Sequence, residues 1–216
     1  MGIFSSLLDI LFPPKCVFCG KIISGGIKVC HKCEASLPET GSNASQKGDF
    51  FSVCVSPFYY EDNVRESLLR YKFNEASAYA PVYSEYLAKT VSGELSGRYD
   101  LISWVPLSKK RYKERGYDQA MLLAKGVSDI LGDTPVKTLV KTKHVKKQST
   151  MGSPEKRRAN ISGAYSVYDR KLIEGKRILL IDDIITSGST LSECARTLRS
   201  AGAAEVMCAT LARSRD

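Results

Sequence analysis

The 216-residue sequence has no apolar run that approaches the roughly 18 residues of a membrane-spanning helix. Its first segment, MGIFSSLLDILFPP, lacks basic residues ahead of the apolar run, carries Asp9 within it and shows no small-residue cleavage pattern. We therefore expect neither a signal peptide nor a membrane span, and we expect a cytoplasmic protein. The sequence also lacks a recurring period, which excludes collagen, coiled coils and repeat arrays.

Two common nucleotide-binding motifs are missing as well. No segment matches GxxxxGK[ST], so an Asp-Asp pair after an apolar strand cannot be interpreted as part of a P-loop nucleoside triphosphatase. GxGxxG is also absent, which argues against a Rossmann dinucleotide site. A hydrophobic fraction of 43% is sufficient for a packed core and excludes wholesale disorder.

Positive charge is concentrated in one part of the chain. The whole sequence carries a net charge of +9, and residues 109–158 contain 14 basic and 5 acidic side chains. The remaining residues balance at 18 basic and 18 acidic. This placement predicts an anionic partner for residues 109–158, either the phosphates of a small molecule or a nucleic-acid backbone.

Four of the seven cysteines form a metal-binding pattern, C-x2-C-x10-C-x2-C. Two CxxC turns let four sulfurs converge on one zinc ion, and a site filled by four thiolates has no open position for catalysis. We therefore predict a structural zinc ion bound by Cys16, Cys19, Cys30 and Cys33. The other three, Cys54, Cys194 and Cys208, lie in apolar surroundings and are expected to be buried.

The pattern predicts two structural units. Residues 1–38 form an N-terminal helix and a zinc ribbon, residues 39–49 a polar linker, and residues 50–216 an α/β domain. Phe4, Leu7, Leu8 and Leu11 fit one face of a short helix before Pro13. That helix docks on the body of the protein in one interpretation, and it binds a membrane surface or a partner in the other. The sequence leaves both interpretations open.

Within residues 50–216, strand and helix patterns alternate, which favours a mainly parallel sheet flanked by helices. Strands are expected at 50–56, 101–106, 135–140, 177–182 and 204–212. Helices are expected at 61–72, 77–92, 117–131 and 190–202. In such sheets the functional residues gather outside the carboxyl ends of the strands.

One loop carries most of the chemistry. In ILLIDDIITSGST, residues 178–190, a buried strand ends in Asp182 and Asp183, and a loop rich in hydroxyls then leads into a helix. Gly188 allows a sharp turn, and the amide groups at the helix start favour an anion. The carboxylates are suited to accept hydrogen bonds from vicinal hydroxyls, so the motif predicts a ribose 5-phosphate site. A plain helix N-cap is the alternative.

This segment resembles the phosphoribosyl-pyrophosphate (PRPP) signature of type I phosphoribosyltransferases. Two further segments, WVPLSKKRYKERGYDQAMLLA (104–124) and KKQSTMGSPEKRRANISGAYSV (146–167), and the four-cysteine segment are together similar to the ComF competence-protein family. The similarity covers nearly the whole chain in matching order. That family pairs a zinc ribbon with a phosphoribosyltransferase domain and is linked to DNA uptake in natural transformation. The resemblance implies a type I phosphoribosyltransferase-like parallel sheet.

The resemblance also assigns roles to individual residues. The ribose hydroxyls of PRPP would contact the catalytic pair Asp182 and Asp183. The 5-phosphate would bind Thr186, Ser187, Gly188, Ser189 and Thr190. The pyrophosphate would meet Leu107, Ser108 and Lys109, with added charge from Lys110, Arg111 and Arg115. Residues 141–160 would form a mobile hood, and Mg²⁺ would be held mainly by PRPP oxygens and water.

The sequence does not identify an acceptor pocket or a general base. Trp104 and Tyr117 either stack on a base or belong to the core, and Asp118 stands where the family often has asparagine. Two function classes stay open: a phosphoribosyltransferase with an unidentified acceptor, and a non-catalytic competence factor that binds single-stranded DNA. Tyrosines interleaved with basic residues suit the second class. Other competence proteins are expected partners in both.

Overall fold

In the computed structural model, the residues described are 13–24, 26–73, 77–142 and 162–215. The predicted N-terminal helix and most of the predicted hood lie outside them. A six-stranded sheet forms the centre, with the strand order β1-β2-β8-β7-β4 and with β3 also paired to β8. In chain order the strands are β1 (Ser45–Gln46), β2 (Cys54–Val55), β3 (Phe58–Tyr59), β4 (Leu101–Trp104), β7 (Arg177–Ile185) and β8 (Glu205–Arg213).

The pairs that β8 forms with β2, β3 and β7 are parallel, as is the β4–β7 pair, and β1 runs antiparallel to β2. This confirms the mainly parallel sheet that the alternating pattern predicts. Strand β7 continues to Ile185, three residues beyond its predicted end, because it stays paired with β8 as far as Arg213. The acidic pair thus lies within the strand rather than after it.

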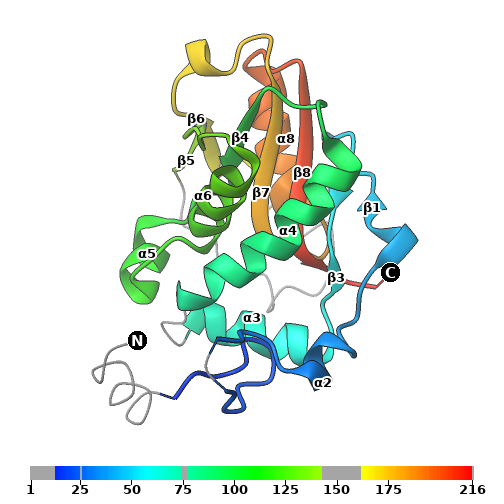
Figure 1. The fold of residues 1–216 in the computed structure, drawn as a ribbon. Helices are drawn as coiled ribbons and strands as arrows, with labels where there is room; N and C mark the ends of the chain where they lie inside the picture. Colours follow the sequence, from blue (N-terminus) through cyan, green and yellow to red (C-terminus); the bar gives the residue numbers. More distant parts are fainter. Residues whose placement is uncertain (1–12, 25, 74–76, 143–161, 216) are drawn as a thin grey trace.

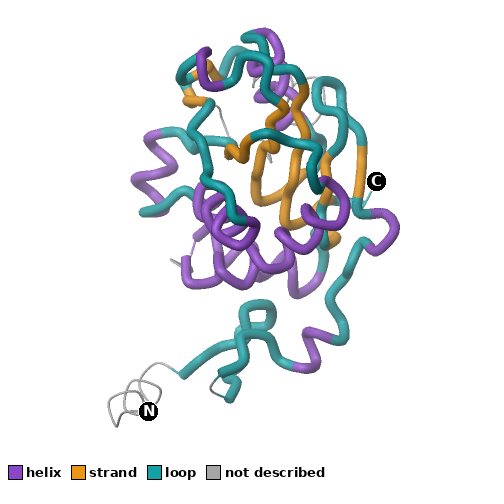
Figure 2. Tube along the Cα trace, turned by 45° about the horizontal axis from the view of Figure 1, so that its top comes forward, coloured by secondary structure: helices purple, strands orange, loops and turns teal. Residues whose placement is uncertain are grey.

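Helices cover both faces of the sheet (Figures 1 and 2). One core contains residues of α3 (Asp62–Phe73), α4 (Ala80–Leu95) and α6 (Gln119–Leu131), packed against the sheet residues Leu179 and Ile181. The other core places α8 (Ser189–Ser200) against Ile178 and Leu180. All four predicted helices are present, and their ends lie within a few residues of the predicted ends. Alternate β7 residues enter opposite cores because successive side chains of a strand point to opposite faces.

Some short elements were not expected. Helix α5 (Lys109–Arg115) has five basic residues among seven, so it shows no apolar periodicity, and its ends are set by Ser108 and by Gly116 with φ 77°. Strand β5 (Leu139–Lys141) overlaps the end of the strand expected at 135–140, and it forms a separate antiparallel pair with β6 (Tyr165–Val167), which was not expected. The remaining elements are α2 (His31–Glu34), η1 (Gly41–Asn43), η2 (Ser77–Tyr79) and η4 (Arg170–Leu172).

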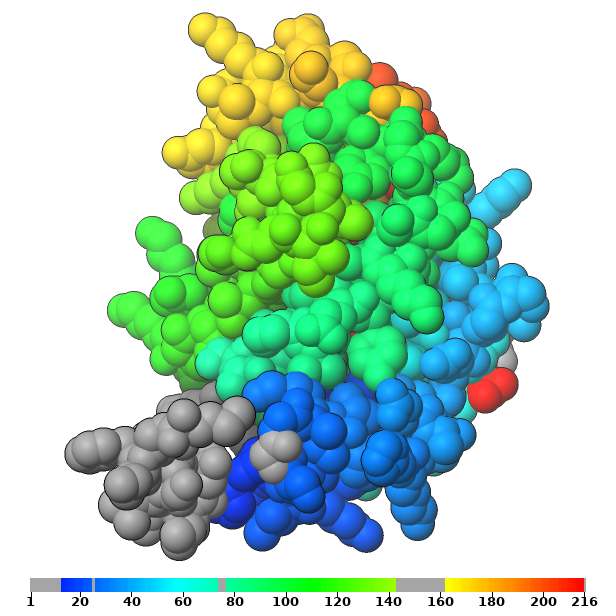
Figure 3. Space-filling view, viewed as in Figure 1, coloured from blue at the N-terminus to red at the C-terminus, as the bar shows by residue number. Residues whose placement is uncertain are grey.

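Residues 39–49, expected to be a linker, contribute to the body of the protein. Strand β1 pairs with β2, and the Ser56 amide donates to the Ala44 carbonyl oxygen at 2.9 Å. The zinc ribbon also joins the body, because the ring of Phe18 is buried 5.7 Å from that of Phe58 and 5.9 Å from that of Tyr86. In Figure 3 the surface of the zinc ribbon, coloured blue, lies directly against the surface of α3 and α4.

None of the helices in the described part of the chain is both long and apolar enough to cross a bilayer.

Candidate functional site at the carboxyl edge of the sheet

The predicted site residues follow two neighbouring parallel strands. Strands β4 and β7 pair directly, with Trp104 opposite Ile181. The loop after β4 leads to Leu107, and the acidic pair and the 186–190 loop occupy the end of β7. Because the strands are parallel, both segments reach the same edge of the sheet. The structure therefore brings the predicted ribose, phosphate and pyrophosphate segments together.

The 186–190 loop forms a small hollow at the start of α8, lined by residues 184–191. Gly188 has φ +68°, a left-handed conformation that disfavours an L side chain. Ser187 Oγ lies 2.9 Å from Ser189 Oγ. The first i→i−4 bond of α8 runs from the Ser192 amide to the Gly188 carbonyl at 2.8 Å, so the helix begins at this loop and the positive end of its dipole faces the loop. This arrangement suits a bound phosphate.

The carboxylate of Asp183 forms an ion pair with a lysine that the sequence did not single out. Oδ2 of Asp183 lies 3.0 Å from Nζ of Lys72, the penultimate residue of α3. The two side chains are 13% and 19% exposed, so solvent screens the pair only partly. No sequence signal marks Lys72, because its approach to Asp183 depends on how α3 packs against the sheet.

Asp182 has different neighbours. Burial and, to a smaller extent, the adjacent charge of Asp183 raise the pKa of its carboxyl to about 8, whereas the Lys72 charge opposes the shift. Oδ1 of Asp182 accepts the amide hydrogen of Asp183 at 2.8 Å. The two aspartates, which the sequence treated as equivalent, therefore differ: Asp183 is paired with a cation, and the neutral form of Asp182 is favoured up to slightly alkaline pH.

The alternation of side chains along β7 changes phase at the acidic pair. Before it, Ile181 enters the core with α3, α4 and α6, while Leu180 enters the core with α8. After it, the even-numbered Ile184 packs against the first core and the odd-numbered Ile185 belongs to the second. A regular strand would keep one parity for each face. The strand is thus reoriented locally at the two aspartates.

The predicted pyrophosphate segment is anchored by Asp118. Its Oδ2 accepts the Leu107 amide at 3.1 Å, and its Oδ1 accepts the Met121 amide at 3.2 Å as the N-cap of α6. Burial raises the pKa of the Asp118 carboxyl, while the hydrogen bond from the Leu107 amide opposes that shift. The acidic residue inside the basic segment therefore holds backbone in place, a role that its N-cap position could have indicated.

Around this anchor, α5 supplies the positive charge. Ser108 caps the helix by accepting the Arg111 amide at 3.3 Å. Lys109 and Lys110 are exposed and so accessible to an anion, whereas Arg111 and Arg115 are partly buried. The Arg115 guanidinium lies 5.2 Å from the Phe73 ring centroid and donates to Gln119 Oε1 at 2.9 Å. Burial lowers the pKa of Arg115, and the charges of the acidic pair oppose this.

Trp104 and Tyr117 both pack against the core with α3, α4 and α6. The Tyr117 hydroxyl donates to the Tyr71 carbonyl oxygen, and the two rings are 5.8 Å apart. These contacts favour the core interpretation of both aromatic residues over base stacking.

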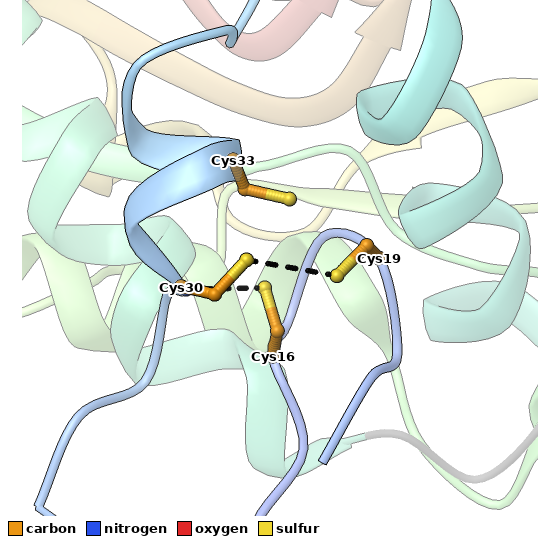
Figure 4. A group of neighbouring side chains, drawn as sticks. All are labelled: Cys16, Cys19, Cys30 and Cys33. Carbon is orange, nitrogen blue, oxygen red and sulfur yellow. Dashed lines mark hydrogen bonds between the residues drawn. The ribbon is translucent and has the colours of Figure 1, made fainter. Parts of the chain in front are cut away.

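The four cysteines of the predicted zinc site converge from two turns and the start of α2 (Figure 4). Their sulfur atoms all lie within 4.8 Å of one another, and Sγ of Cys19 is 3.8 Å from Sγ of Cys30. Tetrahedral zinc with Zn–S bonds of about 2.3 Å requires sulfurs roughly 3.8 Å apart. The Cys30 amide also donates to Cys16 Sγ at 3.4 Å, as expected for a sulfur that carries negative charge.

The residues present therefore fit a structural zinc ion. Residues 7–47 match the family described as a double zinc ribbon domain. That stretch contains four cysteines, enough for one four-thiolate site. The three cysteines outside this cluster are buried as expected: Cys54, Cys194 and Cys208.

Residues 118–216 match the phosphoribosyl transferase domain family, so the acidic pair, the 186–190 loop and strands β7 and β8 lie inside the matched region. Competence protein ComFC of Bacillus subtilis (strain 168) is 34% identical over 162 residues, which is 74% of this chain and 63% of the relative. Competence protein F of Haemophilus influenzae is 38% identical over 112 residues, 51% of this chain and 48% of the relative. The chain belongs to the ComF competence-protein family.

Other relatives align over a greater length. DNA utilization protein YhgH of Escherichia coli (strain K12) is 27% identical over 210 residues, covering 91% of this chain and 90% of the relative. The chain spans less than two thirds of the two competence proteins. Among solved structures, the glutamine PRPP amidotransferase from B. subtilis has a TM-score of 0.41 and 24% identity over 61% of this chain and 26% of its own.

The ComF fold of this chain is thus a type I phosphoribosyltransferase-like α/β domain with an N-terminal zinc ribbon.

Proposed function

We propose that this ComF protein binds PRPP with magnesium at the carboxyl edge of β4 and β7, and that it supports DNA uptake in natural competence. One observation carries the proposal: a helix N-terminus lined by hydroxyls, an acidic pair and the basic helix α5 share one edge of the sheet. Phosphate, diol and pyrophosphate are the three parts of PRPP that need these groups. The names of the competence-protein relatives support the link to DNA uptake.

Phosphoribosyl transfer breaks the bond between C1 and pyrophosphate through an oxocarbenium-like state. Residues 186–190 would hold the 5-phosphate, and the cations of α5 would neutralise the leaving pyrophosphate. Among the described residues, the four cysteines are the only cluster of three or more metal-ligand side chains. Magnesium would therefore enter with PRPP, held mainly by its oxygens and by water.

Calorimetry with PRPP, ribose 5-phosphate and pyrophosphate, each with magnesium, tests the proposal by subsite. The double replacement Asp182→Asn and Asp183→Asn should weaken the binding of PRPP and of ribose 5-phosphate at least about tenfold, because charge-assisted hydrogen bonds to the diol are lost. Pyrophosphate binding should change less. The exposed Asp129→Asn, on α6, is the matched control for one lost carboxylate. Unchanged PRPP affinity in the double variant would sink the ribose assignment.

The alternative function, single-stranded DNA binding without catalysis, is favoured by the aromatic residues of the basic region. Tyr112 is 51% exposed on α5, and Tyr168 is 57% exposed with Lys137 Nζ 4.5 Å from its ring centroid. Stacking and phosphate contacts predict that DNA affinity falls steeply as salt rises. Affinity that stays constant from about 50 to 200 mM salt would exclude this function.

A further inference from the structure

Helix α3 contacts the zinc ribbon along its length and the acidic pair at its C-terminal end, and Figure 1 shows it between the ribbon and the sheet. Toward the ribbon, Nη2 of Arg70 donates to the carbonyl oxygens of Phe18 at 2.6 Å and Val17 at 3.2 Å. Both carbonyls lie inside the first CxxC turn, between Cys16 and Cys19. The position of α3 is therefore tied to the backbone of that turn.

Two further contacts join α3 to the ribbon. Nδ2 of Asn63 lies 3.7 Å from Sγ of Cys33 as a hydrogen-bond donor, which extends the connection to the second CxxC turn. The hydroxyl of Ser67 donates to the Val17 carbonyl oxygen and lies in a buried contact with the Tyr83 hydroxyl. Asn63, Ser67 and Arg70 follow the i, i+4, i+7 spacing of one helix face. That face of α3 is fixed to both zinc-binding turns.

The last residues of α3 contact the candidate site. The Tyr71 carbonyl oxygen accepts a hydrogen bond from the hydroxyl of Tyr117, and Tyr117 directly precedes Asp118. Lys72 forms its 3.0 Å ion pair with Asp183, and Arg115 lies over the Phe73 ring. The helix end that carries the Lys72 ammonium is thus held both by the ribbon and by the loop before α6.

We propose that Lys72 is a positioning residue that holds the Asp183 carboxylate, and that α3 makes this hold depend on the zinc ribbon. A cation held 3.0 Å from the Asp183 carboxylate fixes the orientation of that carboxylate through a charge-assisted contact. The contacts are present in the free protein, whereas the expected effect on ligand affinity rests on the proposed PRPP site. Neither Lys72 nor α3 needs to touch the reacting atoms for this role.

The affinity for PRPP with magnesium, measured by calorimetry, tests the first half. Lys72→Met should weaken binding about tenfold, because the Asp183 carboxylate loses the partly buried charge-assisted contact that orients it. Lys72→Arg keeps the charge and should stay within about threefold of the wild type. Lys125→Met removes an exposed ion pair with Asp129 on α6 and is the matched control. Equal or tighter binding by Lys72→Met, or no rescue by arginine, overturns the proposal.

A pair of charge-matched variants on α3 tests the ribbon connection. Arg70→Gln removes the bonds to Phe18 and Val17, whereas Arg65→Gln removes an equal charge from an exposed position. Arg70→Gln should weaken PRPP binding and Arg65→Gln should not. Combining Arg70→Gln with Lys72→Met should weaken binding no more than Lys72→Met alone, because both act on one contact. Additive losses overturn the connection.

A readout without ligand separates this inference from the PRPP proposal. An ammonium held in a partly buried ion pair exchanges its protons slowly, so the Lys72 side chain should give a resolved nitrogen–proton NMR signal. Arg70→Gln should broaden that signal, and Arg65→Gln should leave it intact. If the wild type shows the signal but does not bind PRPP, the proposed function fails and the role of α3 stands. Absence of the signal, or its persistence in Arg70→Gln, overturns the inference.

Discussion

Lys141 and Tyr165 face each other across the β5–β6 pair, and Nζ of Lys141 donates a hydrogen bond to the Tyr165 hydroxyl at 2.8 Å. The same ammonium lies 4.7 Å from the centroid of the tyrosine ring. These residues join the two ends of the segment that contains the predicted hood. Burial lowers the pKa of Lys141 and raises that of Tyr165. The Tyr165 hydroxyl therefore stays neutral and accepts the hydrogen bond from Lys141.

Removing that hydroxyl should destabilise the protein. Tyr165→Phe leaves the partly buried Lys141 ammonium without this acceptor, which should lower the free energy of unfolding by about 1–2 kcal/mol. Tyr168→Phe is the control, because Tyr168 is exposed and its ring, which faces Lys137, is retained. Denaturant unfolding of both variants checks the prediction. Equal losses in the two would show that the Lys141–Tyr165 bond contributes nothing.

Asp182 should make stability depend on pH. Its pKa is raised in the folded protein, so between about pH 4 and pH 8 the unfolded chain releases a proton that the native state retains. Through this group, stability is therefore highest at acid pH and falls as the pH rises through that window. Asp182→Asn should become more stable than the wild type by on the order of 1–3 kcal/mol toward pH 8.

Thermal and denaturant unfolding of Asp182→Asn and wild type at several pH values measures this difference. The asparagine retains an oxygen that can accept the Asp183 amide, so the hydrogen bond between the two residues need not be lost. Stability curves that run parallel from pH 4 to pH 8 would contradict a raised pKa for Asp182.

Zinc removal should affect the whole protein. Metal analysis should give about one zinc per chain, lost on replacing Cys16→Ser with Cys19→Ser. Because Phe18 packs with Phe58 and Tyr86, loss of the metal should lower the unfolding temperature of the α/β domain as well. Cys54→Ala, in a buried cysteine outside the cluster, should retain the metal. A folded wild type without zinc would refute the site.

Two helical glycines should respond in opposite directions to alanine. A Cβ at Gly126 on α6 would lie 2.2 Å from Oγ and 2.7 Å from Cβ of the buried Ser84 on α4, so the helices would have to move apart. Gly126→Ala should cost about 1–3 kcal/mol of stability. At Gly93 on α4, nothing lies within 4 Å of a new Cβ, and Gly93→Ala should stabilise by about 0.5–1 kcal/mol.

Denaturant unfolding of the two alanine variants gives both signs in one experiment. A neutral result at Gly126 would mean that the α4–α6 contact tolerates a methyl group, and a loss at Gly93 would contradict the open space at that position.

The sequence predicted the elements that follow a strong local rule. The four helices and the main strands show clear apolar periodicity, the cysteines have metal-ligand spacing, and the 186–190 loop combines a glycine with hydroxyls before a helix. The helix α5 was missed because its residues are mostly basic, and its ends are fixed by the Ser108 cap and Gly116. Strand β6 was missed because three residues are too few for a pattern.

The sequence predicted only those parts of the site that are formed by residues close together in the chain. The spacing of Asp182 and Asp183 could not show that they differ, because the difference comes from the surroundings of each carboxyl group, with Lys72 paired to Asp183. The same holds for the contact between Asp118 and the Leu107 amide, eleven residues earlier. Such contacts depend on how separate elements pack, which periodicity and spacing do not encode.

Strand β8 lies inside the sheet, with β7 on one side and β2 and β3 on the other. Its residues, Glu205–Arg213, leave the ribosome after every other described element. Until they do, β2 and β3 have no parallel partner and cannot join β7 and β4. The nascent chain must therefore hold two separated groups of strands with open edges until β8 has been synthesised, and it is most exposed to edge-to-edge aggregation during that interval.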